Sequence, residues 1–442
     1  MEFYLIGIGG AGMSVVAQLL LAQGHQVSGS DRKLNKATDA LVAAGAQVFA
    51  GHDAAQVPPQ AIVVRSSAIK PDNPEYAVAL ERGQEIWHRS QALAFASRNQ
   101  DFIAVAGAHG KTSTSAMIAR TLDALGADPS RAIGGSLAGG LPGGYLGTGT
   151  MLVAEADESD GSFLNYTPRI ALVTNIEPDH LDHYGTAEAF EEAFVDFTRR
   201  IVPNGLLVAC ADHPGSRALA LAARLAGIRT VTYGREESTT DHVHLHDTTV
   251  TYNGKSYQIN LSVPGEHMLL NAAGAWAVCH ELGYDGDDIG RALAAFGGTA
   301  RRFDLRGTEA GVAVIDDYAH HPAEVAVTLA TARKETKGAV RVLFQPHLYS
   351  RTQNFAREFA TALDSADSVI VTSVFPAREV PEDGLEGDAI VAYSEKAIFE
   401  PDMEVAARMI AGQAADGDLI LTMGAGDVTE LPPIILEELA KR

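Results

Sequence analysis

Short apolar runs alternate with stretches of helical periodicity along the whole chain. In the first part, the runs at residues 3–6, 25–30, 47–49 and 62–64 predict strands, and a helix is expected over residues 13–23. Strands that alternate with helices are typical of βαβ units in a parallel sheet. The pattern therefore predicts an α/β fold that begins at the first residues.

The same rhythm starts again twice. Strands are expected at residues 102–106, 151–154, 169–174, 206–209 and 230–233, and then at 313–316, 340–344, 368–372 and 419–423. A polar patch at residues 97–100 and the Gly297-Gly298-Thr299 segment separate the three stretches. We therefore predict three α/β domains, formed by residues 1–97, 98–299 and 300–442.

Two segments of the middle stretch differ from this rhythm. Residues 134–149 hold eight glycines, which is typical of a mobile or substrate-facing loop. Residues 249–263, with Asn253-Gly254 at their centre, predict a β-hairpin in a small antiparallel annex. A helix is expected over residues 269–282.

Composition limits the classes of partner. The chain has 442 residues, of which 46% are hydrophobic, as expected of a soluble globular protein. With 34 Lys and Arg against 56 Asp and Glu, the net charge is −22, which disfavours binding to nucleic acid and to anionic membranes. Two cysteines, no leader pattern and no apolar stretch of about 18 residues predict a cytoplasmic protein without membrane insertion.

The first candidate site is a glycine-rich loop after the first strand. Gly7, Gly9 and Gly12 have the spacing of a dinucleotide-binding loop, and Asp31 stands where such folds place the acidic residue that holds a ribose. A loop of this kind directs backbone N–H groups and a helix N-terminus toward one spot, which suits a phosphate. The fingerprint predicts a phosphate-containing ligand, with NAD as one alternative.

A second glycine-rich loop, Gly107-Ala108-His109-Gly110-Lys111-Thr112, follows residues 102–106 and precedes a helix expected over residues 114–125. A lysine and a threonine after such a loop bind the outer phosphates of a nucleotide and Mg²⁺, respectively. The loop departs from the common form because Val105 occupies the position of the first glycine. We interpret it as an ATP site.

Polar clusters follow the next strands, where active sites of α/β sheets lie. Residues 155–160 hold four carboxylates, which would repel one another unless a cation lies among them. Residues 174–183 include Glu177, Asp179, His180, Asp182 and His183, and if the two strands are neighbours, Glu155 and His180 approach the Lys111 loop from one side. In the last stretch, further clusters occupy residues 300–304, 316–322 and 345–352.

Taken together, these motifs resemble the Mur ligases of bacterial peptidoglycan synthesis. The resemblance covers the whole chain and rests on GIGGAGMS, GAHGKTST, EADESDGSFL, TNIEPDHLDHYG, RRFD, DDYAHHPAE and FQPHLYSRT in this order. It implies a Rossmann-like first domain that binds a UDP-sugar, a central P-loop ATPase-type sheet that binds ATP, and a Rossmann-like third domain that brings the amino acid. It is strongest to the branch that joins L-alanine to UDP-N-acetylmuramate.

The resemblance also implies roles for individual residues. Lys111, Glu155, His180, Arg302, Asp317 and His320 are the expected catalytic residues, and Thr112, Glu155 and His180 are the expected ligands of two Mg²⁺ ions. The ATP site would comprise Gly107, Ala108, His109, Gly110, Lys111, Thr112, Ser113, Asn271 and Arg302, with Asn271 near the adenine. The other substrates would contact Gly9, Gly10, Ala11, Gly12, Met13, Ser14, Asp31, Ser67, His321, Tyr349 and Arg351.

Two positions depart from the family pattern. Met268 stands where relatives often carry asparagine and Leu348 where many carry arginine. The implied reaction passes through an acyl phosphate, and either Asp317 or His320 would orient or deprotonate the amine. We expect a monomer or a weak homodimer.

Three alternatives stay open. They are a ligase that reattaches recycled tripeptide to UDP-N-acetylmuramate, an NAD(P)-dependent oxidoreductase and a non-catalytic nucleotide-binding module. The oxidoreductase would leave the Lys111 loop unexplained, and the presence of Lys111, Glu155 and His180 together argues against the non-catalytic module.

Overall fold

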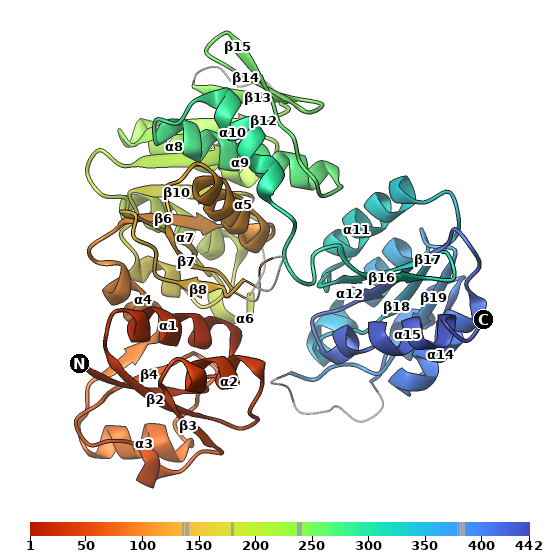
Figure 1. The fold of residues 1–442 in the computed structure, drawn as a ribbon, viewed down its shortest axis with the longest axis horizontal. Coiled ribbons are helices and arrows are strands. Elements are labelled where there is room, and N and C mark those ends of the chain that lie inside the picture. The colour runs from red at the N-terminus through yellow and green to blue at the C-terminus, as the bar shows by residue number, and fades with distance from the viewer. Residues whose placement is uncertain (135–136, 138–140, 178–180, 237–240, 378, 380–384) are drawn as a thin grey trace. The chain divides into compact units, whose positions relative to one another are not determined.

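The structure, a computed structural model, describes residues 1–134, 137, 141–177, 181–236, 241–377, 379 and 385–442, and the side chains of residues 181 and 182 are not described. The chain forms two compact units (Figure 1). The first comprises Met1–Val263 and Met268–Gly297, and the second comprises Pro264–His267 and Gly298–Arg442. The division at Gly297 falls within the glycine segment that the sequence marks as a linker.

The first sheet lies in the first unit and is parallel throughout, in the order β3-β2-β1-β4-β5. Its strands are β1 (Glu2–Ile6), β2 (Gln26–Asp31), β3 (Gln47–Ala50), β4 (Ile62–Arg65) and β5 (Ile86–His88). Its helices are α1 (Ala11–Ala22), α2 (Lys36–Ala43), α3 (Pro74–Glu81) and α4 (Arg89–Ser97). The strand order reverses between β1 and β4, and the first glycine-rich loop leaves β1 at this reversal, where α/β sheets bind ligands.

The second sheet belongs to the same unit and has ten strands in the order β15-β14-β13-β12-β11-β10-β6-β9-β7-β8. Its strands are β6 (Asp101–Ala106), β7 (Ser130–Ala132), β8 (Gly144–Tyr145), β9 (Met151–Glu155), β10 (Ile170–Val173), β11 (Leu206–Cys210), β12 (Arg229–Gly234), β13 (His242–His246), β14 (Thr249–Tyr252) and β15 (Lys255–Gln258). Its helices are α5 (Lys111–Ala124), α6 (Leu181–Tyr184), α7 (Ala187–Arg199), α8 (Pro214–Leu225), α9 (Glu266–Glu281) and α10 (Gly286–Ala292).

Three details of this sheet differ from the sequence-based expectations. β9 and β10 are not neighbours, because β6 lies between them and pairs with both. The predicted hairpin is confirmed as β14 and β15, but it continues the main sheet through β13 rather than forming a separate annex. The described part of the glycine-rich segment includes β8, which pairs with β7, and its Gly144 N–H donates to Gln18 of α1 at 2.9 Å.

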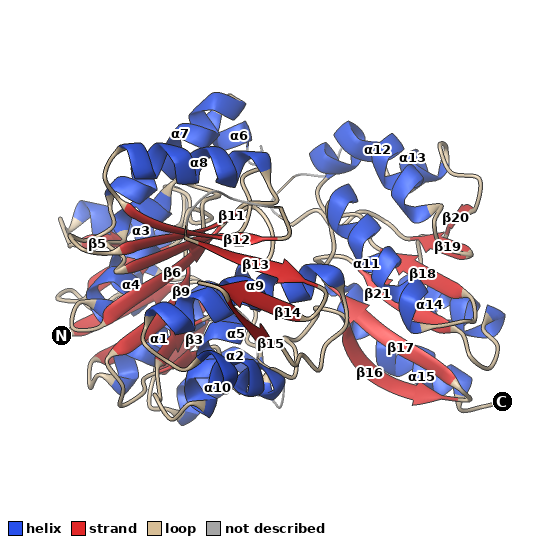
Figure 2. Ribbon diagram, turned by 90° about the horizontal axis from the view of Figure 1, so that it is seen from above, coloured by secondary structure: helices blue, strands red, loops and turns tan. Residues whose placement is uncertain are grey.

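One apolar core joins the first two sheets. It contains Leu19 of α1, Leu93 of α4, Phe102 of β6, Phe163 of the short 3-10 helix Ser162–Asn165, and Phe194 of α7, each at most 6% exposed. Burial of apolar surface between sheets holds them together, so both glycine-rich loops belong to one compact unit. On the other face of the second sheet, α5, α9 and α10 contribute Met117, Trp276 and Ile289, so helices cover both faces (Figure 2).

The third sheet forms the second unit, in the order β16-β17-β21-β18-β19-β20. Its strands are β16 (Asp304–Glu309), β17 (Val312–Asp317), β18 (Val340–Phe344), β19 (Ser368–Val371), β20 (Ala397–Phe399) and β21 (Leu419–Met423). Its helices are α11 (Pro322–Glu335), α12 (Tyr349–Leu363), α13 (Asp388–Val391), α14 (Met403–Gln413) and α15 (Pro432–Leu439). Only β16 pairs antiparallel among these described strands. The α/β fold class with three sheets is therefore confirmed.

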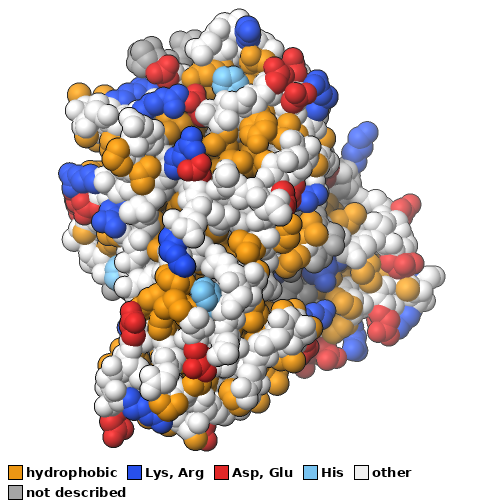
Figure 3. Space-filling view, turned by 60° about the vertical axis from the view of Figure 1, so that its left-hand side comes forward, with side chains coloured by type: hydrophobic (Ala, Val, Ile, Leu, Met, Phe, Trp, Pro, Cys, Tyr) orange, Lys and Arg blue, Asp and Glu red, His pale blue; other side chains and the backbone are white. Residues whose placement is uncertain are grey.

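The surface mixes both signs of charge in spite of the net charge of −22. On the face in Figure 3, Lys and Arg side chains are interspersed with Asp and Glu side chains and with small apolar patches. Among the helices that the structure describes, none combines the length and the apolarity needed to cross a membrane.

Candidate active site

The second glycine-rich loop is held rigidly between β6 and α5. Gly107 has a φ of +133°, and a Cβ added there would lie 2.2 Å from the Thr174 hydroxyl oxygen, so only glycine fits. The His109 carbonyl accepts hydrogen bonds from the Thr174 hydroxyl at 2.6 Å and from the Asn175 amide at 3.0 Å. Because Thr174 and Asn175 directly follow β10, the neighbouring strand fixes the path of the loop.

Lys111, the first residue of α5, folds back over this loop. Its Nζ donates to the Gly107 carbonyl at 2.7 Å and to Glu158 Oε1 at 2.8 Å. Burial alone would lower the pKa of Lys111, but the carboxylates of Glu158 and Asp157 outweigh it, so this pKa lies above its ordinary value. Lys111 therefore carries a fixed positive charge at the loop where a nucleotide phosphate is expected.

Thr112 and Glu155 form an oxygen pair beside the loop. The Thr112 hydroxyl donates to Glu155 Oε2 at 2.8 Å, and the Gly134 N–H donates to Glu155 Oε1 at 2.6 Å. Hard oxygen donors of this kind fit Mg²⁺, which is held by one or two protein groups together with phosphate and water. His180 and Asp179 lie outside the described residues, and no cluster of three or more His, Cys, Asp or Glu suited to a metal occurs in the rest.

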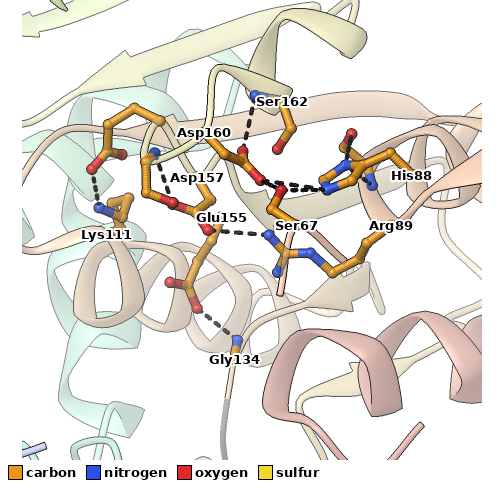
Figure 4. A network of polar contacts seen from close by, with 12 residues as sticks. Ser67, His88, Arg89, Lys111, Gly134, Glu155, Asp157, Asp160 and Ser162 are labelled. Atoms are coloured by element: carbon orange, nitrogen blue, oxygen red, sulfur yellow. Dashed lines mark hydrogen bonds and ion pairs between the residues drawn. The ribbon is translucent and has the colours of Figure 1, made fainter. Parts of the chain in front are cut away.

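The carboxylates of residues 155–160 are held by groups of the protein itself (Figure 4). Arg89 Nη2 donates to Asp157 Oδ2 at 3.1 Å, and Lys111 pairs with Glu158. The Ser67 hydroxyl donates to Asp160, which also lies 3.4 Å from His88 Nε2. Asp157 and Glu158 therefore need no bound cation between them, because two basic side chains supply the compensating charge.

Two of these partners were missed in the sequence. Glu158 belongs to the acidic run, but nothing in the spacing tells which carboxylate meets Lys111. Arg89 lies 68 residues from Asp157 and has no motif around it. Burial would raise the pKa of Asp160, but hydrogen bonds from His88, Ser162 and Ser67 hold it well below its ordinary value.

Glu177 was singled out only as part of a cluster, and the structure places it against the loop. Its Oε2 lies 3.2 Å from His109 Nε2, and its Oε1 lies 3.5 Å from His213 Nε2. Hydrogen bonds from both rings hold the pKa of Glu177 well below its ordinary value. His109 is therefore fixed by a permanent negative charge on the far side of its ring from the backbone.

Asn271, on α9, borders the same loop. A Cβ added at Gly110, whose φ is +84°, would lie 3.0 Å from Asn271 Oδ1. The side chain thus lies at the start of α5, and a contact to adenine stays a prediction. Met268 is only 3% exposed and packs in the core of this face, which explains how an apolar residue is accommodated there.

The first glycine-rich loop is tied to β2. The N–H groups of Gly7 and Ile8 donate to the Ser30 carbonyl at 2.8 and 2.9 Å, and the Gly9 N–H donates to Asp31 Oδ2 at 2.9 Å. The carboxylate of Asp31, expected at a ribose, therefore already supports the loop backbone.

Helix α1 follows this loop without interruption and has Gly10 as its N-cap, so Ala11 and Gly12 form its first turn. Met13 and Ser14 are buried, and the Ser14 N–H donates to the Gly10 carbonyl at 2.8 Å.

In the second unit, Asp317 ends β17 and is fully engaged. Its Oδ2 accepts from the Phe303 N–H at 2.7 Å, and its Oδ1 accepts from the Ala319 N–H at 2.9 Å and the Thr328 hydroxyl at 3.1 Å. Burial raises the pKa of Asp317, although Arg302 and these donors oppose the rise. This carboxylate holds the segments that carry Arg302 and His320.

His320 and Arg302 lie on those segments. His320 Nδ1 lies 2.9 Å from the Tyr318 carbonyl, which can only accept, so Nδ1 carries the proton and Nε2 is an acceptor. Burial lowers the pKa of His320 to about 4, with Arg351 adding to the effect and Glu324 opposing it. The Arg302 guanidinium lies 4.9 Å from the centre of the Tyr318 ring, and within the described part of the chain it makes no hydrogen bond or ion pair.

The remaining predicted residues of this unit lie around α11 and α12. His321 is the N-cap of α11 and contacts the Phe355 ring, with ring centres 5.2 Å apart. Tyr349 is the first residue of α12 and is 5% exposed, and Arg351 is the third residue of the same helix. Leu348, with a φ of +69°, is buried, so its side chain serves packing.

These features define a class of enzyme. A glycine-rich loop after a central parallel strand, a lysine in it and a Thr–carboxylate pair beside it are the parts of a site that binds and transfers nucleotide phosphate. Three family models match the chain: "Mur ligase family, catalytic domain" over residues 2–100, "Mur ligase middle domain" over 147–279 and "Mur ligase, glutamate ligase domain" over 301–426. The chain belongs to the Mur ligase family.

Individual relatives agree with this membership. A UDP-N-acetylmuramate–L-alanine ligase of Renibacterium salmoninarum is 50% identical over 99% of this chain and 96% of its own, and one of Kineococcus radiotolerans is 49% identical with the same coverage. The crystal structure of a UDP-N-acetylmuramate–alanine ligase from Thermotoga maritima matches with a TM-score of 0.82, at 29% identity over 100% of this chain and 99% of that chain. A murein peptide ligase from Psychrobacter arcticus matches with a TM-score of 0.74, at 26% identity and the same coverage. The resemblance inferred from the motifs is confirmed, and the oxidoreductase alternative loses its support.

Proposed function

We propose that this enzyme joins L-alanine to the lactoyl carboxylate of UDP-N-acetylmuramate at the expense of ATP, a step of peptidoglycan precursor synthesis. The observation that carries the proposal is the Lys111 loop, in which a half-buried lysine with a fixed charge lies next to the Thr112–Glu155 pair. The whole-chain relatives that bear this activity in their names support the choice of substrates.

The proposed chemistry requires two negatively charged groups, the lactoyl carboxylate and the γ-phosphate of ATP, to approach each other. A lactoyl carboxylate oxygen attacks the γ-phosphorus of ATP, the bond to the β-phosphate oxygen breaks, and an acyl phosphate and ADP result. The amine of L-alanine then attacks the acyl carbon, phosphate leaves, and the nitrogen loses a proton. Lys111 offsets the repulsion between carboxylate and γ-phosphate, the kind of stabilisation that dominates phosphoryl transfer.

The proposal also assigns roles to a metal and to residues of the second unit. Thr112, Glu155 and His180 would hold Mg²⁺, in two sites, and the metal would neutralise phosphate charge. Arg302, whose guanidinium makes no hydrogen bond or ion pair in the described part, would contact a phosphate. Asp317 and His320 are the two candidates to orient or deprotonate the amine. His320 offers an unprotonated Nε2, whereas both carboxylate oxygens of Asp317 already accept hydrogen bonds from the protein.

The substrate of the first loop follows from the same argument. Both glycine-rich loops lie in one compact unit, and a ligase of this kind needs one for ATP and one for the diphosphate of the UDP-sugar. Gly9, Gly10, Ala11 and Gly12 would supply the backbone contacts. The domain ranges 1–97, 98–299 and 300–442, and a monomeric or weakly dimeric state, belong to the proposal as well.

The test is release of ADP with UDP-N-acetylmuramate as carboxylate substrate. We expect turnover that depends on L-alanine and on Mg²⁺. The matched comparison replaces L-alanine by the tripeptide used in recycling, because a murein peptide ligase is also similar to this chain. Turnover with the tripeptide and none with L-alanine would refute the proposed acceptor, and no ADP release with either would refute the ligase itself.

A further inference from the structure

Arg89 is a half-buried basic residue that the chemistry above does not use. It is the first residue of α4, and its guanidinium lies against the first turn of α1. A Cβ added at Gly12 would lie 2.1 Å from Arg89 Nη1 and 3.1 Å from its Cδ and Cζ. Gly12 lies in a regular helix, so its backbone does not require glycine, and the missing side chain makes room for Arg89.

The same guanidinium reaches the acidic loop after β9. Its Nη2 donates to Asp157 at 3.1 Å, and the next residue, Glu158, pairs with Lys111 at 2.8 Å (Figure 4). Two adjacent carboxylates are thus held between two basic side chains, Arg89 on α4, which packs over Gly12, and Lys111 at the second glycine-rich loop. Glu158 is fully buried, so its position, and with it that of Lys111, depends on how Asp157 is held.

Arg89 also has capacity for a further acceptor. A guanidinium carries five N–H groups, and the Nε of Arg89 is buried without a hydrogen-bond partner among the described residues. A buried donor without an acceptor is unfavourable, and an anion at the N-terminus of α1 would relieve it. Arginine binds phosphate oxygens in this way, with two parallel donors.

We propose that Arg89 is a positioning residue that serves both glycine-rich loops: through Asp157 and Glu158 it fixes Lys111, and over Gly12 it holds a positive charge for the diphosphate of the nucleotide sugar. This inference rests on the proposed function of the first loop. It makes Arg89 the group shared by the two phosphate sites, whereas Asp157 serves only the second.

The experiment measures KM for ATP and for UDP-N-acetylmuramate in the full-length enzyme. We expect Arg89→Met to raise both KM values about tenfold, and Asp157→Asn to raise only that for ATP, with KM for the nucleotide sugar within about twofold. The KM for ATP of the double variant Arg89→Met/Asp157→Asn should be no higher than that of either single variant, because both substitutions remove the same contact. Arg89→Lys, which keeps the charge, should recover part of the nucleotide-sugar affinity but not the ATP effect.

Two further variants distinguish the effect of where the Arg89 guanidinium lies from the effect of its charge and from a general effect on folding. Gly12→Ala keeps Arg89 but forces its outer atoms to move, so it should reproduce the Arg89→Met pattern. Arg98→Met is the matched control, because Arg98 caps the other end of α4 and its guanidinium lies 3.7 Å from the centre of the Phe95 ring. It should leave both KM values unchanged.

The inference is overturned if Arg89→Met lowers only the fraction of active enzyme with both KM values unchanged, which is the result of a merely structural role. Additive effects of Arg89→Met and Asp157→Asn on KM for ATP would overturn it as well. Failure of the proposed function would be seen separately, as loss of L-alanine-dependent turnover by the unaltered enzyme. If the tripeptide proves to be the acceptor, the same KM comparison applies with the tripeptide.

Discussion

Replacing Lys111 by methionine removes the charge opposite a carboxylate that has no exposure to solvent. In the folded variant, Glu158 would be buried without its partner at 2.8 Å, and burial raises its pKa above the ordinary 4.5. The carboxyl group would then become protonated rather than stay charged in the interior. The substitution therefore affects folding as well as catalysis, and the two effects can be separated.

The size of the folding effect follows from the ordinary pKa. Protonating a carboxyl group of pKa 4.5 at pH 7 costs about 1.4 kcal/mol per pH unit, which sets an upper limit of about 3 kcal/mol for the loss in the free energy of unfolding, since burial raises this pKa in the unaltered protein as well. Because the folded-state pKa is the higher one, this loss is absent below about pH 4.5 and grows as the pH rises. The double variant Lys111→Met/Glu158→Gln has no charge to bury and should regain most of the stability at pH 7.

Urea unfolding at pH 5 and pH 7 measures these differences, and ADP release measures activity. Both variants should lose turnover by about a hundredfold or more, since each lacks the positive charge that we propose faces the γ-phosphate. Lys334→Met is the control for stability, because its pair with Glu266 at 3.2 Å is more than half exposed and contributes little. A single variant as stable as the unaltered enzyme at pH 7, or a double variant that is no more stable than the single one, would refute the reasoning.

Three further predictions concern other parts of the two units. Gly107→Ala should destabilise the loop by about 2 kcal/mol or more and weaken ATP binding in calorimetry, because the Cβ would lie 2.2 Å from the Thr174 hydroxyl at a φ of +133°; unchanged affinity would contradict the loop geometry. Thr112→Val should raise the Mg²⁺ concentration for half-maximal activity severalfold, and an unaltered Mg²⁺ titration would exclude the hydroxyl as a ligand. His320→Gln should make stability less sensitive to acid: the pKa of His320 is lowered from 6.5 to about 4, so the unaltered protein loses about 3 kcal/mol as the pH falls through this window, and denaturation at pH 7 and pH 4.5 should show a smaller difference in the variant.

The sequence predicted the buried strands well and the edge strands poorly. Central strands such as β1 and β6 are nearly continuous apolar runs, because both faces of a parallel sheet are covered. β5 has only three residues, and β16 carries exposed polar side chains, so neither shows a periodicity that stands out. The antiparallel hairpin was found because Asn253-Gly254 specifies its turn directly.

The residues of the candidate site likewise divide into those that the sequence could identify and those that it could not. Residues on one loop, such as Lys111 and Thr112, can be identified because a local backbone shape demands a local pattern. Arg89 and Glu158 could not, since their contacts depend on which strand lies beside which. The position of β6 between β9 and β10 decides these contacts, and it is a property of the topology that no short pattern contains.

The apolar core that joins the first two sheets has a consequence for how this protein can be divided. Residue 97 ends the first run of βαβ units, and a fragment cut there would keep every strand of the first sheet. It would, however, expose to water the side chains of α1 and α4 that otherwise meet Phe102, Phe163 and Phe194. Apolar surface of that kind favours aggregation over a stable isolated domain. The first sheet with its helices is thus separable in sequence and in topology but dependent on its neighbour for solubility, so the smallest independent piece to express is the whole first unit.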